Sequence, residues 1–131
     1  MSRFVSAGDV NGLKVINRFA GDRVFDLESV IWLSPEREVW IPFVETDALH
    51  IRPVVSASVT QNKMTGLLIR AVRDLRIIDS ECVRFYDIHR IRYVDSPPTV
   101  IVQTGVPLVL ECAVDVLDVT LCANRPIHGS P

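Results

Sequence analysis

The stretch RFYDIHRIRYVDSPPTVIV, residues 84–102, holds two runs of β-branched and aromatic residues on either side of a proline-rich turn. Such residues suit a pleated, half-buried strand. The turn, residues 95–98, combines Asp and Ser, which bond the local backbone, with two prolines, which fix φ and cannot donate to a strand ladder. This stretch therefore predicts a β-hairpin formed by residues 88–94 and 99–104.

A second stretch, RVFDLESVIWLSPEREVWI at residues 23–41, aligns with the first without a gap at a shift of 61 residues (84 − 23). Its apolar positions coincide with those of the first stretch, and only Ile31 against Arg92 breaks the match. Its turn is Ser-Pro-Glu-Arg. The alignment predicts a second hairpin, formed by residues 27–33 and 38–44.

Residues 13–17 and 75–79 extend the match, since both contain an apolar residue, a basic residue, two β-branched residues and a turn-former. The alternative explanation is that any two hairpins of similar length share a pattern. We predict an internal duplication, because two units could bury each other's apolar face, which neither could do alone. The single domain would span residues 1–131, with pseudo-repeats at about 13–60 and 75–121 and a short C-terminal tail at 122–131.

The fold class predicted from these strands is all-β, a small barrel or sandwich built from two pseudo-repeated hairpin-rich units, with room for one short helix. Further strands are expected at Lys14–Phe19 and Val54–Thr60. Residues 66–73 fit either a short helix or the first strand of the second unit. Residues 110–121 are also ambiguous, and we favour a strand because the corresponding part of the first unit contains Pro53.

Composition indicates a domain that needs a partner. Hydrophobic residues make up 48% of the 131 residues, at the upper edge of globular usage. A chain of this length buries only about two thirds of its surface on folding. Self-association or a place in a larger assembly would cover the remaining apolar surface, and the alternative is a monomer with an unusually apolar core.

Charge and cysteine usage limit the possible partners and the cellular location of the protein. The net charge of −2 argues against a general electrostatic attraction to nucleic acid, and no apolar run approaches the roughly 18 residues of a membrane span. The first residues lack the apolar stretch of a secretory signal. The three cysteines, Cys82, Cys112 and Cys122, form no Cys-x-x-Cys pair and are predicted to be buried free thiols. We expect a cytoplasmic location.

No catalytic, cofactor or metal signature is present in the sequence. A trio of Cys82, Asp87 and His89 could be drawn together, but exposed strand residues are the simpler interpretation. Asp26 and Asp87 hold the same place in both copies, and we favour local backbone bonding at a bend over a symmetric carboxylate site. A solvated face is likewise favoured over a cation site for the acidic set Glu111, Asp115 and Asp118.

The second copy carries a basic strip with aromatic residues interleaved. Arg90 and Arg92 are two apart, so on a strand both point to one face while Ile91 and Tyr93 point to the other. A phosphate backbone or a stacked base would use such side chains, although ion pairing with nearby acidic residues is the favoured alternative. The nucleic-acid candidates are Arg84, His89, Arg90, Arg92 and Tyr93.

In the first copy this strip has lost its charge, because Ser29 replaces Arg90 and Ile31 replaces Arg92. Aromatic side chains are common anchors of protein interfaces, and core packing of the tryptophans is an equal alternative. The protein-interface candidates are Ile31, Trp32, Trp40 and Phe43.

The favoured function is a non-enzymatic binding or assembly module that acts through protein–protein contacts as an oligomer or subunit. The first alternative is a nucleic-acid-binding domain, and the feature that would favour it is a single unpaired face shared by Arg84, Arg90 and Arg92. The second is a small-ligand binder or enzyme with its site between the repeats, and a filled interior would argue against it.

Overall fold

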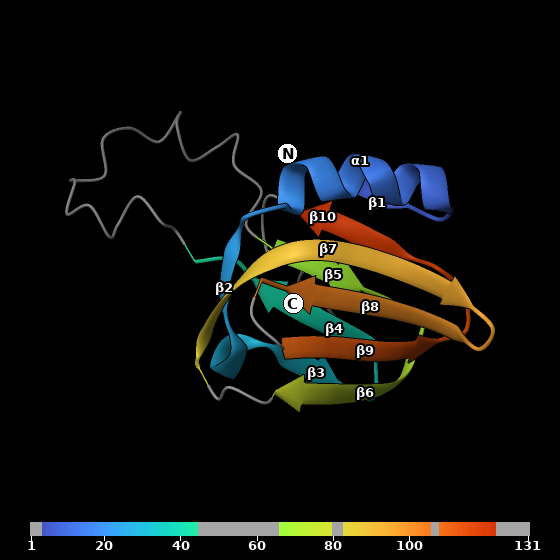
Figure 1. Cartoon of the computed structure of the whole chain (residues 1–131). Helices are drawn as coiled ribbons and strands as arrows, with labels where there is room; N and C mark the ends of the chain where they lie inside the picture. Colours follow the sequence, from blue (N-terminus) through green and yellow to red (C-terminus); the bar gives the residue numbers. More distant parts are fainter. Residues whose placement is uncertain (1–3, 45–65, 80–82, 106–107, 123–131) are drawn as a thin grey trace, which may run out of the picture.

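The computed structural model describes residues 4–44, 66–79, 83–105 and 108–122. Strands dominate these residues and form two curled antiparallel sheets around a common core, accompanied by one short α-helix (Figure 1). The predicted all-β fold, a small barrel or sandwich with one short helix, is confirmed.

Each sheet has five strands. The first has the order β1-β10-β5-β4-β3 and comprises β1 (Phe4–Ala7), β3 (Ile31–Leu33), β4 (Glu38–Pro42), β5 (Gly66–Ile69) and β10 (Val119–Cys122). The second has the order β2-β7-β8-β9-β6 and comprises β2 (Val24–Asp26), β6 (Val72–Asp79), β7 (Phe85–Asp95), β8 (Pro98–Thr104) and β9 (Leu108–Val114). The helix α1 (Val10–Ala20) and the 3-10 turn η1 (Leu27–Ser29) complete the described elements.

Two bent chain segments join the sheets at one corner. β5 leads into β6 through two residues, and β9 leads into β10 through a short turn. Because β5 pairs with β10 and β6 pairs with β9, the two segments cross between the sheets as one ribbon. Backbone hydrogen bonds from Arg70 to Asp118 and from Asp115 to Ala71 hold the corner, where Ala71 adopts a φ of 57°.

The opposite side of the barrel closes through β2 and the end of β4. Phe25 and Phe43 form an antiparallel bridge, and the Val44 N–H donates to the Val24 carbonyl at 2.6 Å. The two sheets therefore contact each other through the backbone on both sides of the core.

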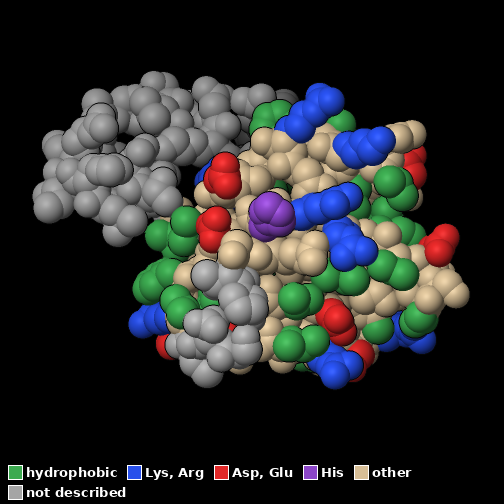
Figure 2. Space-filling model, in the orientation of Figure 1, with side chains coloured by type: hydrophobic (Ala, Val, Ile, Leu, Met, Phe, Trp, Pro, Cys, Tyr) green, Lys and Arg blue, Asp and Glu red, His purple; other side chains and the backbone are tan. Residues whose placement is uncertain are grey.

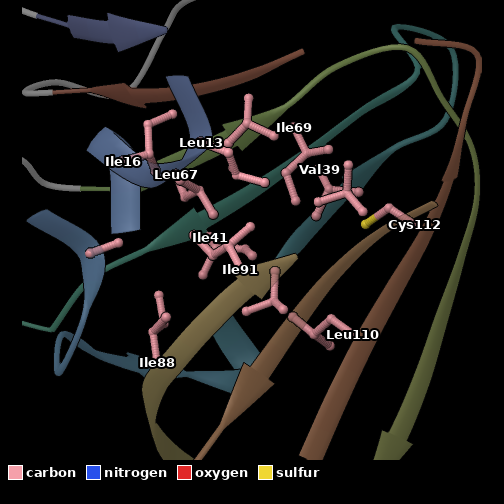
Figure 3. Close-up of a cluster of buried hydrophobic side chains, with 14 of the residues drawn as sticks. Leu13, Ile16, Val39, Ile41, Leu67, Ile69, Ile88, Ile91, Leu110 and Cys112 are labelled. Carbon is pink, nitrogen blue, oxygen red and sulfur yellow. The ribbon is translucent and has the colours of Figure 1, made fainter. Parts of the chain in front are cut away.

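Apolar side chains fill the described interior. β9 shows the alternation that produces this core, because Leu108, Leu110, Cys112 and Val114 are buried while the intervening residues are half-buried. Figure 3 shows side chains from both sheets and from α1 converging on this interior.

The strand predicted for Lys14–Phe19 is wrong, since these residues lie in α1. The Asp9 carboxylate caps the helix by accepting a hydrogen bond from the Gly12 N–H at 2.7 Å. Leu13, Ile16 and Ala20 recur at helical spacing, are buried, and cover the gap between β1, β10 and β7. The β-branched pair at positions 15 and 16 misled the prediction.

Both predicted hairpins are present. The second is confirmed as β7 and β8, and the first is shorter than predicted, since Leu27–Ser29 forms η1 and only β3 and β4 pair. Residues 66–73 form β5 and the start of β6 rather than a helix. Residues 110–114 and 119–121 lie in β9 and β10, as favoured, but a turn at residues 115–118 separates the two strands. Val54–Thr60 lies outside the described residues.

The hairpin registers follow the predicted repeat. Ile31 pairs with Trp40 and Arg92 pairs with Ile101, so both partners shift by the same 61 residues. Residues 13–17 and 75–79, by contrast, are helix and strand respectively. The structure thus reproduces the pairing of the hairpins but not the short N-terminal match, and the duplication stays a prediction.

Replacing Gly66 by Ala should destabilise the fold by about 1–3 kcal/mol. A Cβ at this position would lie 2.3 Å from Cη2 of Trp40, whose indole covers the glycine. Gly8→Ala is the matched control, because its nearest atom would be the Leu117 carbonyl oxygen at an ordinary 3.8 Å. Urea denaturation of both variants measures the difference, and equal stability of the two would contradict this packing.

Candidate functional site

The outer face of β7 carries a group of exposed basic side chains. Ile88 pairs with Thr104 but Arg90 pairs with Gln103, so His89 is an extra residue in a β-bulge. Ile88 and Ile91 are buried, while His89, Arg90 and Arg92 are exposed. Arg90 and Arg92 therefore share the outer face as their spacing predicts, and the bulge adds His89 to it.

Helix α1 is attached to β7 next to this group. The Asn17 Oδ1 accepts a hydrogen bond from the Ile91 N–H at 2.8 Å, and the Asn17 Nδ2 donates to the Ile91 carbonyl at 2.9 Å. β2 pairs with β7 only as far as Asp87, so the Asn17 amide takes the place of a neighbouring strand beyond that point. This contact fixes the position of the helix relative to the strand.

The helix adds two further cations to the same side of the molecule. Lys14 and Arg18 are exposed and lie about 60° and 100° around the helix from Asn17, on the side away from the core. Figure 2 shows the one histidine that the structure describes, His89, beside Lys and Arg side chains. We call the group the basic face; it consists of Lys14, Arg18, His89, Arg90 and Arg92.

Arg84 does not belong to the basic face. Its guanidinium donates to both carboxylate oxygens of Asp26, at 3.0 and 2.9 Å, and lies 3.7 Å from Glu28. It also lies over the Phe85 ring, 5.2 Å from the centroid. The condition that Arg84, Arg90 and Arg92 share one unpaired face is therefore not met. Tyr93 is also removed from the strip, since it packs half-buried against the core.

Asp26 acts at a bend, as the favoured interpretation has it. Its carboxylate accepts hydrogen bonds from the Glu28 N–H at 3.0 Å and the Ser29 hydroxyl at 3.4 Å, and so caps η1. The hydrogen bond from Arg84 lowers the pKa of Asp26 below its usual value, against the opposing effect of burial. Asp87 lies on the same face of the β2–β7 ladder and is exposed.

The four interface candidates of the first copy pack against other side chains of the same chain. Trp40 is only 4% exposed and forms a small cluster with Leu68 and Cys122 on the outer side of the first sheet, against which Ile31 packs. Trp32 and Phe43 pack half-buried against the main core. Core packing, the equal alternative, therefore describes both tryptophans in the described part of the chain.

A different set of apolar side chains is exposed at one end of the barrel. The Tyr86 hydroxyl accepts from the Val83 N–H at 2.8 Å and donates to Asp79 at 2.6 Å, which brings the end of β6 beside the start of β7 (Figure 1). Sequence analysis missed this set, because edge position is not visible in a local pattern. We call it the apolar rim; it consists of Ile77, Ile78, Val83 and Phe85.

The remaining candidates for chemistry have structural roles. Cys112 and Cys122 are buried free thiols as predicted, and burial raises the pKa of Cys112 to about 12, which makes it a poor nucleophile at neutral pH. Cys82 lies outside the described residues. Asp115 is ion-paired with Arg37 and Arg73. In the described part of the chain, no His, Cys, Asp or Glu residues cluster as a metal site would require.

Comparison with known proteins gives no further assignment. No protein-family model, no curated protein and no solved structure matches this chain. The described residues include no helix with the length and apolar character needed to span a bilayer. Function must therefore be inferred from the surface chemistry of the basic face and the apolar rim.

Asn17→Ala should destabilise the protein by about 1–3 kcal/mol, because it leaves the N–H and carbonyl of Ile91 without their partners. The measurement is the free energy of unfolding in urea. Asn11→Ala is the control, since Asn11 is an exposed residue of the same helix. A loss no greater than that of Asn11→Ala would show that the helix is held by its apolar contacts alone.

Asp26→Asn should lower the melting temperature at pH 7, and this deficit should shrink as the pH falls. The folded-state pKa of Asp26 lies below its unfolded value of about 3.9, so its stabilising effect is complete above that pH and is lost as the pH falls through the folded-state pKa. Melting curves from pH 7 to pH 2 measure the change. An equal deficit for Asp87→Asn at pH 7 would argue against the Arg84 contact as the cause.

Proposed function

We propose that this protein is a cytoplasmic, non-enzymatic binding module that assembles through protein–protein contacts at the apolar rim. The observation that carries the proposal is the exposure of the four rim side chains, which are 47%, 41%, 45% and 50% exposed at Ile77, Ile78, Val83 and Phe85. Exposed apolar side chains gathered at one end of a domain support an interaction site there. The free cysteines support the proposed location, since oxidising compartments favour disulfides.

β6 has the features of a strand that can pair with another chain. It lies at the end of the described strand order and has β9 as its one neighbour there. It carries Arg73, Asp74 and Arg76 before Ile77, and charged residues commonly protect an exposed edge. Its second half presents Ile77 and Ile78 on opposite faces, between Arg76 and Asp79. This half is therefore suited to strand addition, in which backbone hydrogen bonds extend a sheet across an interface.

The rim is also held in a fixed shape. Tyr86 is 1% exposed, and its hydroxyl bonds both to Asp79 at the end of β6 and to Val83 before β7. A surface ordered before binding loses less conformational entropy when a partner arrives.

A second copy of the chain is the proposed partner, because closed twofold dimers are the commonest assemblies of soluble proteins. Antiparallel pairing of two β6 strands would bring Ile77 against its counterpart and continue the sheet through both molecules.

Light scattering after size exclusion, across a tenfold range of concentration, tests the assembly. The wild-type chain should be a dimer, and Ile77→Lys should give a monomer, because a charge at the edge opposes strand pairing. Val116→Lys is the control, since Val116 is 56% exposed in the turn before β10 and lies outside the rim. A monomeric wild type, or a dimer that persists in Ile77→Lys, would contradict the proposal.

A further inference from the structure

We infer that the basic face binds the phosphodiester backbone of a nucleic acid, at a surface separate from the apolar rim. The inference rests on the way the fold gathers cations from α1 and β7 without carboxylate partners among the residues that the structure describes.

Two structural devices bring these cations together. The Asn17–Ile91 hydrogen bonds hold α1 beside β7, and Lys14 and Arg18 lie on the same helix at about 60° and 100° around its axis from Asn17. The bulge places His89 and Arg90 on the same outer face, and Arg92 follows two residues later. Residues 74 positions apart in the sequence are thereby joined in one cationic surface.

The cations of the basic face differ from the other described cations. Arg37, Arg70, Arg73 and Arg84 each form an ion pair with a described carboxylate. Arg23 lies over the Phe43 ring at 4.8 Å, and Arg76 lies across the ladder from Glu111. No ion pair between described residues involves Lys14, Arg18, Arg90 or Arg92. Like charges gathered without counter-charges repel one another, and an anionic ligand would relieve that repulsion.

Acidic residues border the basic face at one end. Asp22 donates its N–H to the Ile88 carbonyl at 2.8 Å, and Asp87 lies two residues before His89. The positive surface therefore extends from His89 towards Arg92 and across to the helix. It is local, because the whole chain carries a net charge of −2.

The side-chain chemistry favours nucleic acid over an anionic membrane. Three of the four permanent cations are arginines, whose planar guanidinium groups match phosphate oxygens in pairs. Tyr93 packs inward, so the face offers no described aromatic ring for base stacking. Binding should therefore depend on the backbone and not on base sequence.

Fluorescence anisotropy with a labelled oligonucleotide of mixed sequence, single-stranded and duplex, tests the inference. Four phosphate contacts predict that affinity falls about 50–150-fold between 50 and 200 mM salt. Arg90→Gln/Arg92→Gln should weaken binding at least tenfold at the lower salt and make the salt dependence shallower by about two contacts. Ile77→Lys should bind as the wild type does, since the rim is a separate surface.

Arg73→Gln/Arg76→Gln is the matched control, because it changes the net charge equally at exposed positions of β6 outside the basic face. It should retain wild-type affinity, and circular dichroism should show both double variants folded. Binding of either nucleic-acid form with this pattern supports the inference. No binding at 50 mM salt, an equal loss in both double variants, or binding to phosphatidylserine vesicles but not to oligonucleotides would overturn it.

Discussion

The pairing of β5–β6 with β9–β10 is the constraint on which the rest of the structure depends. Because this ribbon turns through the corner at Ala71 and Asp115, both sheets enclose one core instead of forming two flat layers. Bending the sheets in this way leaves β6 at one boundary of the second sheet and exposes one side of β7 beyond Asp87. Both surfaces to which we assign a role lie at these two boundaries.

The two boundaries differ in whether their backbone groups are already hydrogen-bonded. Along β7, the Asn17 amide and the backbone of residues 22–23 bond the N–H and carbonyl groups of Ile88 and Ile91, so another strand cannot pair there. What remains there is the outward row of side chains, which is polar and basic. Along β6, Arg73, Asp74 and Arg76 precede Ile77 and Ile78, where the strand keeps both its apolar side chains and its edge. One boundary therefore offers side-chain chemistry, and the other offers backbone pairing.

The sequence predicts strands well where turn chemistry and β-branched runs coincide, as in the hairpin of β7 and β8. It fails at α1, where Val15 and Ile16 suggest a strand although Asp9 and the spacing of the buried residues mark a helix. Two of the five residues of the basic face, Arg90 and Arg92, follow from their period-two spacing. The position of Lys14 and Arg18 depends on hydrogen bonds between residues 74 positions apart, and Arg84 was misassigned because its partner lies 58 residues away.

The ladder between β2 and β7 pairs residues that hold equivalent positions in the predicted repeat. Phe25 faces Tyr86, and these two residues occupy the same place in the predicted repeat, 61 positions apart (86 − 25). Antiparallel strands that meet at equivalent residues are related by a local twofold axis, as in an isologous contact between identical subunits. If the two halves descend from one shorter chain, this ladder is the former interface of its homodimer, later made intramolecular by gene fusion.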